Sequence, residues 1–163
     1  MRFSVVIPSL NEEEYIRLPL ESLREQTFKD FEIILVDGGS RDKTVEIAEE
    51  YGAKIIVGSQ GKIGSDRNLG ASYAKGEILV FTEADSILPS FWLEKISQKF
   101  QDERVIAVAG AGYPYKAPPF CMLEYKLYNI ARVAFSKLPF PFRRFMSSGY
   151  NLAVRKNMFE KSR

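Results

Sequence analysis

The sequence predicts an α/β fold, with a mostly parallel central sheet and helices on both of its faces. Short apolar segments alternate with helical patterns through the first hundred residues, which is typical of a parallel sheet. Several apolar segments end in acidic or small polar residues, as expected where strand ends line a ligand crevice. The chain has 163 residues, which fits one domain with its own core.

The first predicted strand covers 3–7 and ends at Pro8. Asn11 is expected to cap a helical turn over 12–17, after which a helix restarts with Pro19 in its first turn. The next predicted elements are a strand at 31–37, a helix at 42–51 ended by Gly52, a strand at 53–57, a helix at 65–75 and a strand at 77–82.

The remaining elements are a helix from Pro89 to about 101, a strand at 105–109, a helix at 120–138, a strand at 149–154 and a helix over 156–161. The helix at 120–138 has apolar residues at helical spacing: Leu123, Leu127, Ile130, Ala134 and Leu138. We expect this helix to face the core and to be followed by a loop. Because 120–145 is also aromatic and basic, peripheral contact with a membrane or a lipid-linked acceptor is the alternative.

The composition limits the classes of function. The net charge is only +2, so we expect no nucleic-acid partner, because such proteins carry a concentrated basic surface. The chain has no histidine, which excludes histidine-based acid–base catalysis and histidine metal ligands. Any metal would therefore be held by carboxylates, which favours Mg²⁺ or Mn²⁺.

Neither a secretory signal nor a long apolar segment is recognisable. The chain begins directly with a predicted strand, and no segment reaches the roughly 18 apolar residues of a membrane-spanning helix. The single cysteine, Cys121, excludes an internal disulfide and is compatible with a reducing compartment. We therefore expect a cytoplasmic protein, with the inner face of the membrane as the alternative location.

Four motifs follow one another in a fixed order. Three lie at or just after predicted strand ends and one opens a helix. They are Val6-Ile7-Pro8-Ser9-Leu10-Asn11-Glu12-Glu13, Leu35-Val36-Asp37-Gly38-Gly39-Ser40, Asp66-Arg67-Asn68-Leu69-Gly70 and Thr82-Glu83-Ala84-Asp85. In the last motif, Glu83 and Asp85 alternate on extended backbone, so both carboxylates are expected to point toward one ligand.

In this order the motifs resemble the nucleotide-sugar half of a family 2 glycosyltransferase with the GT-A fold, over about residues 3–160. The resemblance implies a Rossmann-like GT-A fold and a hexosyltransferase-like, inverting enzyme. The substrates would be a nucleoside-diphosphate sugar and a glycan or lipid-phosphate acceptor. The single domain would comprise a nucleotide-sugar-binding part at 1–112 and the start of the acceptor-side part at 113–163.

The resemblance also implies roles for individual residues. Asp85 would be the main ligand of Mg²⁺ or Mn²⁺, with Glu83 as a weaker candidate because the family has aspartate there. Asp37 would accept hydrogen bonds from the base or ribose, although Gly38 replaces the family's second aspartate. The expected donor-binding set is Pro8, Leu10, Glu12, Asp37, Lys62, Arg67, Glu83, Ala84 and Asp85.

Structural alternatives stay open for these residues. The acidic pair could cap the turn before Pro89, Asp37 could form an Asx-turn, and Arg67 could make a structural salt bridge. The family's catalytic base follows a stretch resembling 149–155, so we expect it beyond Arg163, in which case the chain is truncated, or else missing. Whether the 163 residues alone are active is therefore open.

Two other functions compete with transfer. One is a non-catalytic nucleotide-sugar-binding domain, favoured by the missing base and by Glu83. The other is a sugar-phosphate nucleotidyltransferase, which would need a glycine-rich loop after the first strand. The chain has Pro8-Ser9-Leu10-Asn11-Glu12 there instead, which disfavours the nucleotidyltransferase.

Overall fold

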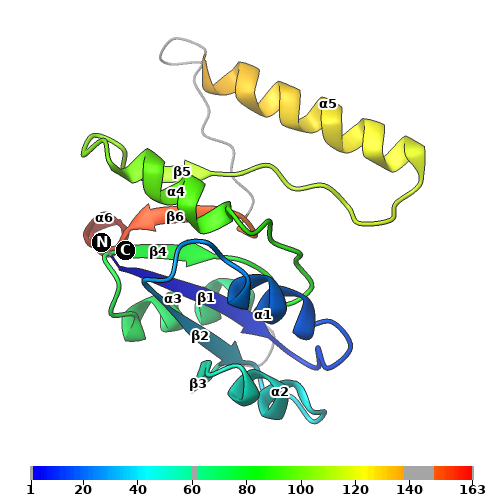
Figure 1. The fold of residues 1–163 in the computed structure, drawn as a ribbon, viewed down its shortest axis with the longest axis vertical. Coiled ribbons are helices and arrows are strands. Elements are labelled where there is room, and N and C mark those ends of the chain that lie inside the picture. Colours follow the sequence, from blue (N-terminus) through cyan, green and yellow to red (C-terminus); the bar gives the residue numbers. More distant parts are fainter. Residues whose placement is uncertain (1, 60–61, 138–148, 163) are drawn as a thin grey trace.

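A six-stranded sheet forms the centre of the computed structural model, which describes residues 2–59, 62–137 and 149–162 (Figure 1). The strand order is β3-β2-β1-β4-β6-β5. The first four strands are parallel: β1 (Phe3–Ser9), β2 (Phe31–Asp37), β3 (Lys54–Val57) and β4 (Ile78–Phe81). The strand β6 (Leu152–Arg155) runs antiparallel to both β4 and β5 (Ala107–Ala109). The predicted mostly parallel sheet is confirmed.

Helices cover both faces of this sheet. One buried cluster joins the sheet to α1 (Arg17–Arg24), α2 (Thr44–Glu50) and α4 (Trp92–Phe100). A second cluster, on the other face, joins it to α3 (Ile63–Tyr73) and α6 (Lys156–Lys161). Every residue of β1 is buried, as expected for a central strand of a parallel sheet that is covered on both faces.

Several predicted boundaries differ from the structure for local reasons. The helix α2 begins at Thr44 rather than at 42, because the Asp42 carboxylate accepts a hydrogen bond from the Thr44 amide (3.0 Å) and so precedes the helix. It ends before Gly52, whose φ of +74° makes it the expected C′ glycine. Pro19 lies in the first turn of α1, as predicted.

The helix α5 (Pro119–Ser136) corrects the prediction that this segment faces the core. Leu123, Leu127 and Ile130 are exposed, whereas the polar residues Asn129 and Arg132 are buried. Figure 1 shows α5 set apart from the sheet beyond β5. Leu138 and the predicted basic loop at 139–145 lie outside the described residues. Among the described helices, none is long and apolar enough to span a membrane.

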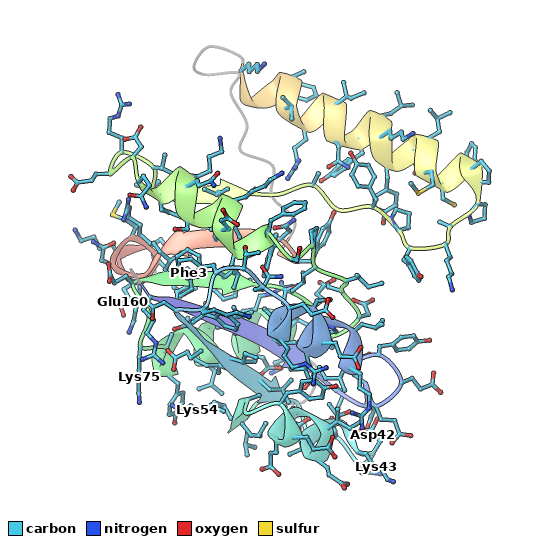
Figure 2. The ribbon with its side chains drawn as sticks, viewed as in Figure 1. Phe3, Asp42, Lys43, Lys54, Lys75 and Glu160 are labelled. Atoms are coloured by element: carbon cyan, nitrogen blue, oxygen red, sulfur yellow. The ribbon has the colours of Figure 1, made fainter. Side chains whose placement is uncertain are left out.

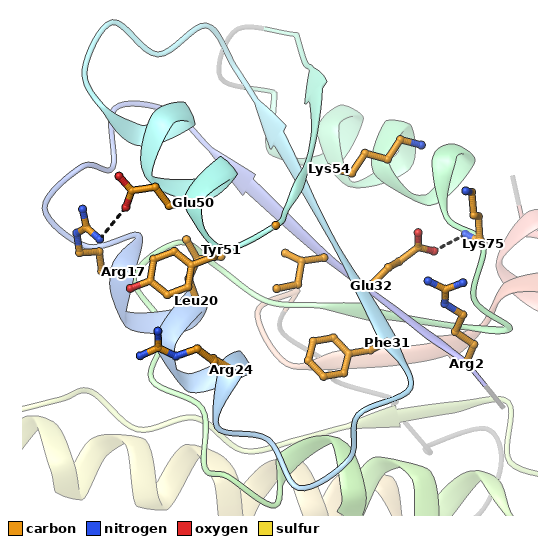
Figure 3. Close-up of a pocket in the computed structure, with 12 residues that line it drawn as sticks. Arg2, Arg17, Leu20, Arg24, Phe31, Glu32, Glu50, Tyr51, Lys54 and Lys75 are labelled. Atoms are coloured by element: carbon orange, nitrogen blue, oxygen red, sulfur yellow. Dashed lines mark hydrogen bonds and ion pairs between the residues drawn. The ribbon is translucent and has the colours of Figure 1, made fainter.

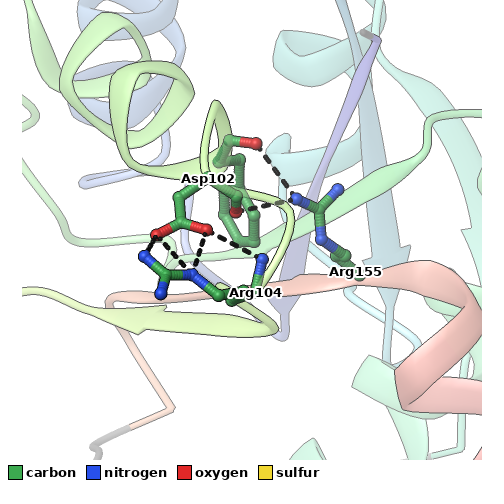
Figure 4. Close-up of polar contacts among 4 residues, drawn as sticks. Asp102, Arg104 and Arg155 are labelled. Atoms are coloured by element: carbon green, nitrogen blue, oxygen red, sulfur yellow. Dashed lines mark hydrogen bonds and ion pairs between the residues drawn. The ribbon is translucent and has the colours of Figure 1, made fainter.

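The side chain of Arg155, at the end of β6, binds backbone carbonyls at the end of α4 and in the segment that follows it (Figure 4). Its Nε donates to the Val105 carbonyl (2.9 Å), and its Nη2 donates to the carbonyls of Phe100 (3.0 Å) and Asp102 (3.3 Å). These bonds satisfy carbonyls that the end of a helix leaves free. The Val105 carbonyl is thus engaged by the Arg155 side chain, and β5 starts at Ala107 rather than at 105.

Replacing Arg155 by methionine should destabilise the fold by about 2 kcal/mol, because several charge-assisted hydrogen bonds to carbonyls are lost. Urea unfolding followed by Trp92 fluorescence measures this, since Trp92 is the single tryptophan and is buried. Arg104→Met is the control, because the Arg104–Asp102 ion pair is exposed and should contribute little. Equal losses in both variants would contradict the structural role of Arg155.

Candidate functional site

The carboxyl ends of the parallel strands bring the sequence motifs together at one edge of the sheet. Ser9 and Asp37 are register partners at the ends of β1 and β2. The backbone continues this contact, because the Gly38 amide donates to the Ser9 carbonyl (2.8 Å). Thr82, directly after β4, donates its amide to the Val6 carbonyl (3.3 Å). The first, second and fourth motifs therefore meet where the topology predicts a ligand crevice.

The loop after β1 is tied to the loop after β2. The Asn11 amide donates to Ser40 Oγ (2.9 Å), the Arg41 amide donates to Asn11 Oδ1 (2.9 Å), and the Glu12 amide donates to Thr44 Oγ1 (2.7 Å). The prediction that Asn11 caps the following helix is wrong, because its side chain is used in this bridge and its φ is +54°. In Figure 2, Asp42 marks this end of the sheet and Phe3 the other.

Sequence reasoning assigned no role to Ser40, Asp42 or Thr44. A signal for them exists, because short polar residues spaced two apart before a helix are typical of turns and caps. Their effect is to hold the Glu12 backbone in a fixed position at the site.

Asp37 forms the Asx-turn that the sequence left as an alternative. Its carboxylate accepts hydrogen bonds from the Gly39 amide (3.1 Å), the Ser40 amide (3.0 Å) and the Ser40 hydroxyl. The residue is 8% exposed. A carboxylate can accept about four hydrogen bonds, so this turn leaves it little further capacity. A contact between Asp37 and a nucleotide remains a prediction.

Arg67 is held between two parts of the chain. Its Nη2 donates to Glu83 Oε1 (3.1 Å), which is the salt bridge considered as the structural alternative. Its guanidinium also lies against Gly149, where a Cβ atom would collide with it. The Arg67 Nε is buried without a hydrogen-bond partner among the described residues. Sequence reasoning missed the role of Gly149, because no local pattern reveals a contact across 82 positions.

The helix start that carries Arg67 is fixed by Asp66. Asp66 is buried, and its Oδ1 accepts hydrogen bonds from the Ser59 amide (2.7 Å) and the Ser59 hydroxyl (3.0 Å). Lys62 precedes α3 and is exposed. On the β1 side, Pro8 is buried and Leu10 is exposed, so only the Leu10 side chain is open to a ligand.

The acidic motif does not continue the strand as predicted. The chain turns at Ala84 and Asp85, and the Ser86 amide approaches the Glu83 carbonyl (3.4 Å). The turn has a packing cause, since the Ala84 side chain is buried in the core and only its backbone could meet a ligand. Asp85 is exposed and Glu83 is half-buried. The two carboxylates therefore do not simply project in parallel from extended backbone.

Four carboxylates nevertheless share this region. Burial raises the pKa of the Glu12 carboxyl above its ordinary value of 4.5, and the charges of Asp85, Asp42 and Glu83 raise this pKa further. The loops thus gather negative charge that a cation would neutralise.

Replacing Glu12 by glutamine should raise the melting temperature at neutral pH and leave it unchanged well below pH 4.5. The folded pKa is raised, so the native state binds the proton more tightly than the unfolded chain, and stability falls as pH rises through the folded pKa. Glutamine removes this penalty. Thermal unfolding across pH measures the effect. Glu14→Gln, an exposed change in the same loop, is the control, and a similar gain there would contradict the assignment.

A divalent cation is compatible with these residues, although no group of three or more acidic or cysteine side chains among the described residues is arranged to hold one. Mg²⁺-type sites commonly use one or two carboxylates together with substrate phosphates. Asp85 is exposed and available, whereas Glu83 is already paired with Arg67. Two hydroxyl oxygens at this edge, Ser9 Oγ and Thr82 Oγ1, are buried without a partner among the described residues.

A separate hollow lies away from these strand ends. A cleft of about 780 Å³ opens over the start of β2 and includes Arg2, Phe31, Glu32 and Tyr51 (Figure 3). None of the predicted site residues lines it. The candidate site is therefore the carboxyl ends of β1, β2 and β4, where the motifs meet, and not this cleft.

Comparison with known proteins gives a consistent result. The family model described as glycosyl transferase family 2 matches residues 4–161. The putative glycosyltransferase EpsH of Bacillus subtilis is 36% identical over 110 residues, which cover 64% of this chain and 32% of EpsH. The chain spans about a third of this curated relative.

Two solved structures resemble the fold. The mannosyltransferase PcManGT of Pyrobaculum calidifontis, in complex with GDP-Man and Mn²⁺, has a TM-score of 0.77 and 24% identity, covering 99% of this chain and 46% of that chain. TarS 1–349 of S. aureus, in complex with UDP-GlcNAc, has a TM-score of 0.72 and 22% identity, covering 99% of this chain and 47% of that chain. The predicted Rossmann-like GT-A fold is confirmed.

Proposed function

Because the chain belongs to glycosyl transferase family 2, we propose that it binds a nucleoside-diphosphate sugar at the carboxyl edge of its sheet and transfers the sugar. The observation that carries this proposal is the meeting of the first, second and fourth motifs at that edge, where the charges of Asp85, Asp42 and Glu83 add to burial in raising the pKa of Glu12. An anionic ligand can approach such a cluster only with a cation, and a nucleotide diphosphate normally arrives with one.

The nucleoside would lie against the first two strand ends. Pro8, Leu10, Glu12 and Asp37 would contact it, and the bridge from Asn11 to Ser40 and Arg41 supports this by joining their loops. The diphosphate would lie toward Asp85, with Lys62 and Arg67 as the nearby cations of the donor-binding set. The GDP-Man and UDP-GlcNAc complexes of the two similar structures support a nucleotide sugar as the donor class.

Asp85 is the proposed ligand of Mg²⁺ or Mn²⁺, and Glu83, anchored by Arg67, is the second candidate. The cation would supply charge neutralisation for the departing diphosphate. Arg67 would add a second positive charge near the diphosphate. Mn²⁺ in the complex of PcManGT supports the use of a divalent ion.

We propose an inverting transfer in one step. The acceptor hydroxyl oxygen forms a bond to the anomeric carbon while the bond from that carbon to the diphosphate oxygen breaks. The electron pair leaves with the nucleoside diphosphate, and the hydroxyl proton passes to a base outside the residues assigned above. Positioning and stabilisation of the leaving group supply the rate enhancement.

Residues 1–112 would form the donor part and 113–163 the start of the acceptor part. β6 comes from the second segment but lies between β4 and β5, so both segments share one sheet. The proposed acceptor is a glycan or a lipid phosphate, and the proposed location is the cytoplasm, with the inner face of the membrane as the alternative.

Thermal unfolding with a panel of UDP-, GDP- and dTDP-sugars, each with and without Mn²⁺, tests the proposal. A ligand that binds the native state raises the melting temperature by mass action. The expected result is a shift with one nucleotide class that requires Mn²⁺. No shift with any donor, in a chain that melts cooperatively, would contradict donor binding at this edge.

A non-catalytic nucleotide-sugar-binding domain is the second candidate. The observation that favours it is the salt bridge between Arg67 and Glu83, which occupies one of the two carboxylates of the acidic motif. Release of nucleoside diphosphate from the bound donor separates the two functions. A domain that only binds would show the thermal shift without turnover.

A further inference from the structure

The helix α5 leaves its large apolar side chains exposed and buries two polar ones. Its polar residues Asn129 and Arg132 are buried, and Asn129 Nδ2 donates to the Gly112 carbonyl (3.2 Å). Its large apolar residues are exposed, most strongly Phe120, Leu123, Leu127 and Ile130. An apolar helix face normally packs against the core, so this orientation leaves the apolar face without a partner in the described part of the chain.

The outward face is a continuous stripe of large side chains. Its members recur at spacings of three and four residues, so they lie along one side of the helix. Their exposed fractions are high, at 76% for Phe120, 55% for Leu123, 58% for Leu127 and 66% for Ile130. Scattered exposed apolar residues are ordinary, but an aligned set of this kind marks an interaction surface.

The charge around this stripe is strongly one-sided. Residues 113–137 carry four cations and one carboxylate, whereas the whole chain carries 23 cations and 21 carboxylates. Lys126 and Lys137 lie at helical spacing from Ile130, so they flank the stripe along one margin. Two exposed tyrosines, Tyr115 and Tyr128, add side chains suited to a polar–apolar boundary.

We propose that the outward face of α5 lies on an anionic lipid surface, with Phe120, Leu123, Leu127 and Ile130 entering the interfacial region. This proposal rests on the proposed function in one respect, because a lipid-phosphate acceptor would be bound at such a surface. Flanking lysines and interfacial tyrosines are the features of helices that lie in a membrane interface. A second copy of the chain fits less well, since a symmetric contact would bring the two basic segments together.

Flotation with phosphatidylcholine vesicles, with and without phosphatidylglycerol, tests the proposal. The 163-residue chain should bind the anionic vesicles and be released by high salt. Leu127→Glu should weaken this binding about tenfold or more. Val57→Glu is the matched control, because Val57 is an 83% exposed apolar residue on the edge strand β3 and the change in charge is identical. It should bind as the unmodified chain does.

The electrostatic part is tested separately. Lys126→Gln with Lys137→Gln should weaken binding about fivefold per lysine, whereas Lys99→Gln with Lys161→Gln, also exposed, should change it little. A fluorophore on Leu127→Cys in a Cys121→Ser background should be quenched by spin-labelled lipid, and one on Val57→Cys should not. The quenching measurement does not use the Leu127→Glu variant, so it tests the proposal even if that variant fails to fold.

Absence of binding to anionic vesicles would overturn the proposal. So would equal losses for Leu127→Glu and Val57→Glu, which would place the contact on another surface. A dimer that Leu127→Glu dissociates, without vesicle binding, would show a second copy as the occupant instead. The Mn²⁺-dependent donor shift should persist in Leu127→Glu, so failure here is distinguishable from failure of donor binding.

Discussion

Replacing Asp85 by alanine should abolish the Mn²⁺-dependent stabilisation that a nucleotide sugar gives to this chain. Asp85 is the exposed carboxylate of the acidic motif, whereas Glu83 is engaged by Arg67 at 3.1 Å. Removing a residue that merely orients a metal ligand costs about 10- to 100-fold in metal affinity, so removing the ligand itself should cost at least about 100-fold. A donor at about 100 times its Kd stabilises by about 2.7 kcal/mol, and most of this should disappear.

The measurement is the melting temperature with donor, with and without Mn²⁺, complemented by calorimetric titration of donor in the presence of Mn²⁺. Glu103→Ala is the control, because it removes the same charge from an exposed position between α4 and β5. It should keep the full shift. If Asp85→Ala keeps the shift and Glu83→Gln loses it, the metal assignment is reversed.

Asp85→Ala also carries an expectation for the metal-free chain. Among the charged residues that raise the pKa of Glu12, Asp85 makes the largest contribution. Its removal should bring this pKa closer to the ordinary value, and the pH dependence of stability caused by Glu12 should become weaker. A cluster that stabilises a bound cation is thus also a cluster that opposes folding without one.

The sheet could be predicted from sequence because its signals are local. An apolar run before Pro8 predicts a strand, and Gly52 predicts the end of a helix. The prediction that Pro8 ends the strand was wrong, because β1 continues through Pro8 to Ser9, whereas α2 does end before Gly52. Alternation of strand and helix then restricts the topology to a parallel sheet, and parallel strands place their carboxyl ends together. The gathering of the motifs follows from that rule alone.

The details of the site depend on contacts between distant residues, which no local pattern contains. Asn11 is a residue type that often caps helices, yet its side-chain oxygen accepts a hydrogen bond from the Arg41 amide of the neighbouring loop. Arg67 meets both Glu83 and Gly149. The turn at Ala84 arises because this side chain packs in the core. In each case tertiary packing decided between structures that the sequence alone allows.

The helix α5 shows a different limit of sequence reasoning. The spacing of Leu123, Leu127 and Ile130 correctly predicts a helix with an apolar face. It does not tell what covers that face, since a core, a partner and a lipid surface all require the same periodicity. The prediction of a core-facing helix was wrong, because Leu123, Leu127 and Ile130 are exposed while Asn129 and Arg132 are buried.

Gly76→Ala should be the most destabilising single methyl addition considered for this fold. A Cβ at Gly76 would lie 2.7 Å from the Phe3 carbonyl carbon and the Ser4 nitrogen, and 2.8 Å from the Arg2 oxygen. All three atoms are backbone, so no side chain can move aside. The Gly76 amide also donates to Ser4 Oγ (2.8 Å), which fixes the approach. Accommodating the methyl group requires moving the start of β1, the central buried strand.

The expected loss is about 3 kcal/mol or more, at the upper end for overpacking, because backbone rather than a rotamer must shift. Urea unfolding followed by Trp92 fluorescence measures it. Gly64→Ala is the matched control: Gly64 lies in the first turn of α3 and has no atom within 4 Å of an added Cβ. Since alanine is the better helix former, this variant should gain about 0.5–1 kcal/mol. The two substitutions add the same methyl group, so opposite signs would isolate the close backbone contact as the cause, and a loss below about 1 kcal/mol at Gly76 would show that β1 can yield.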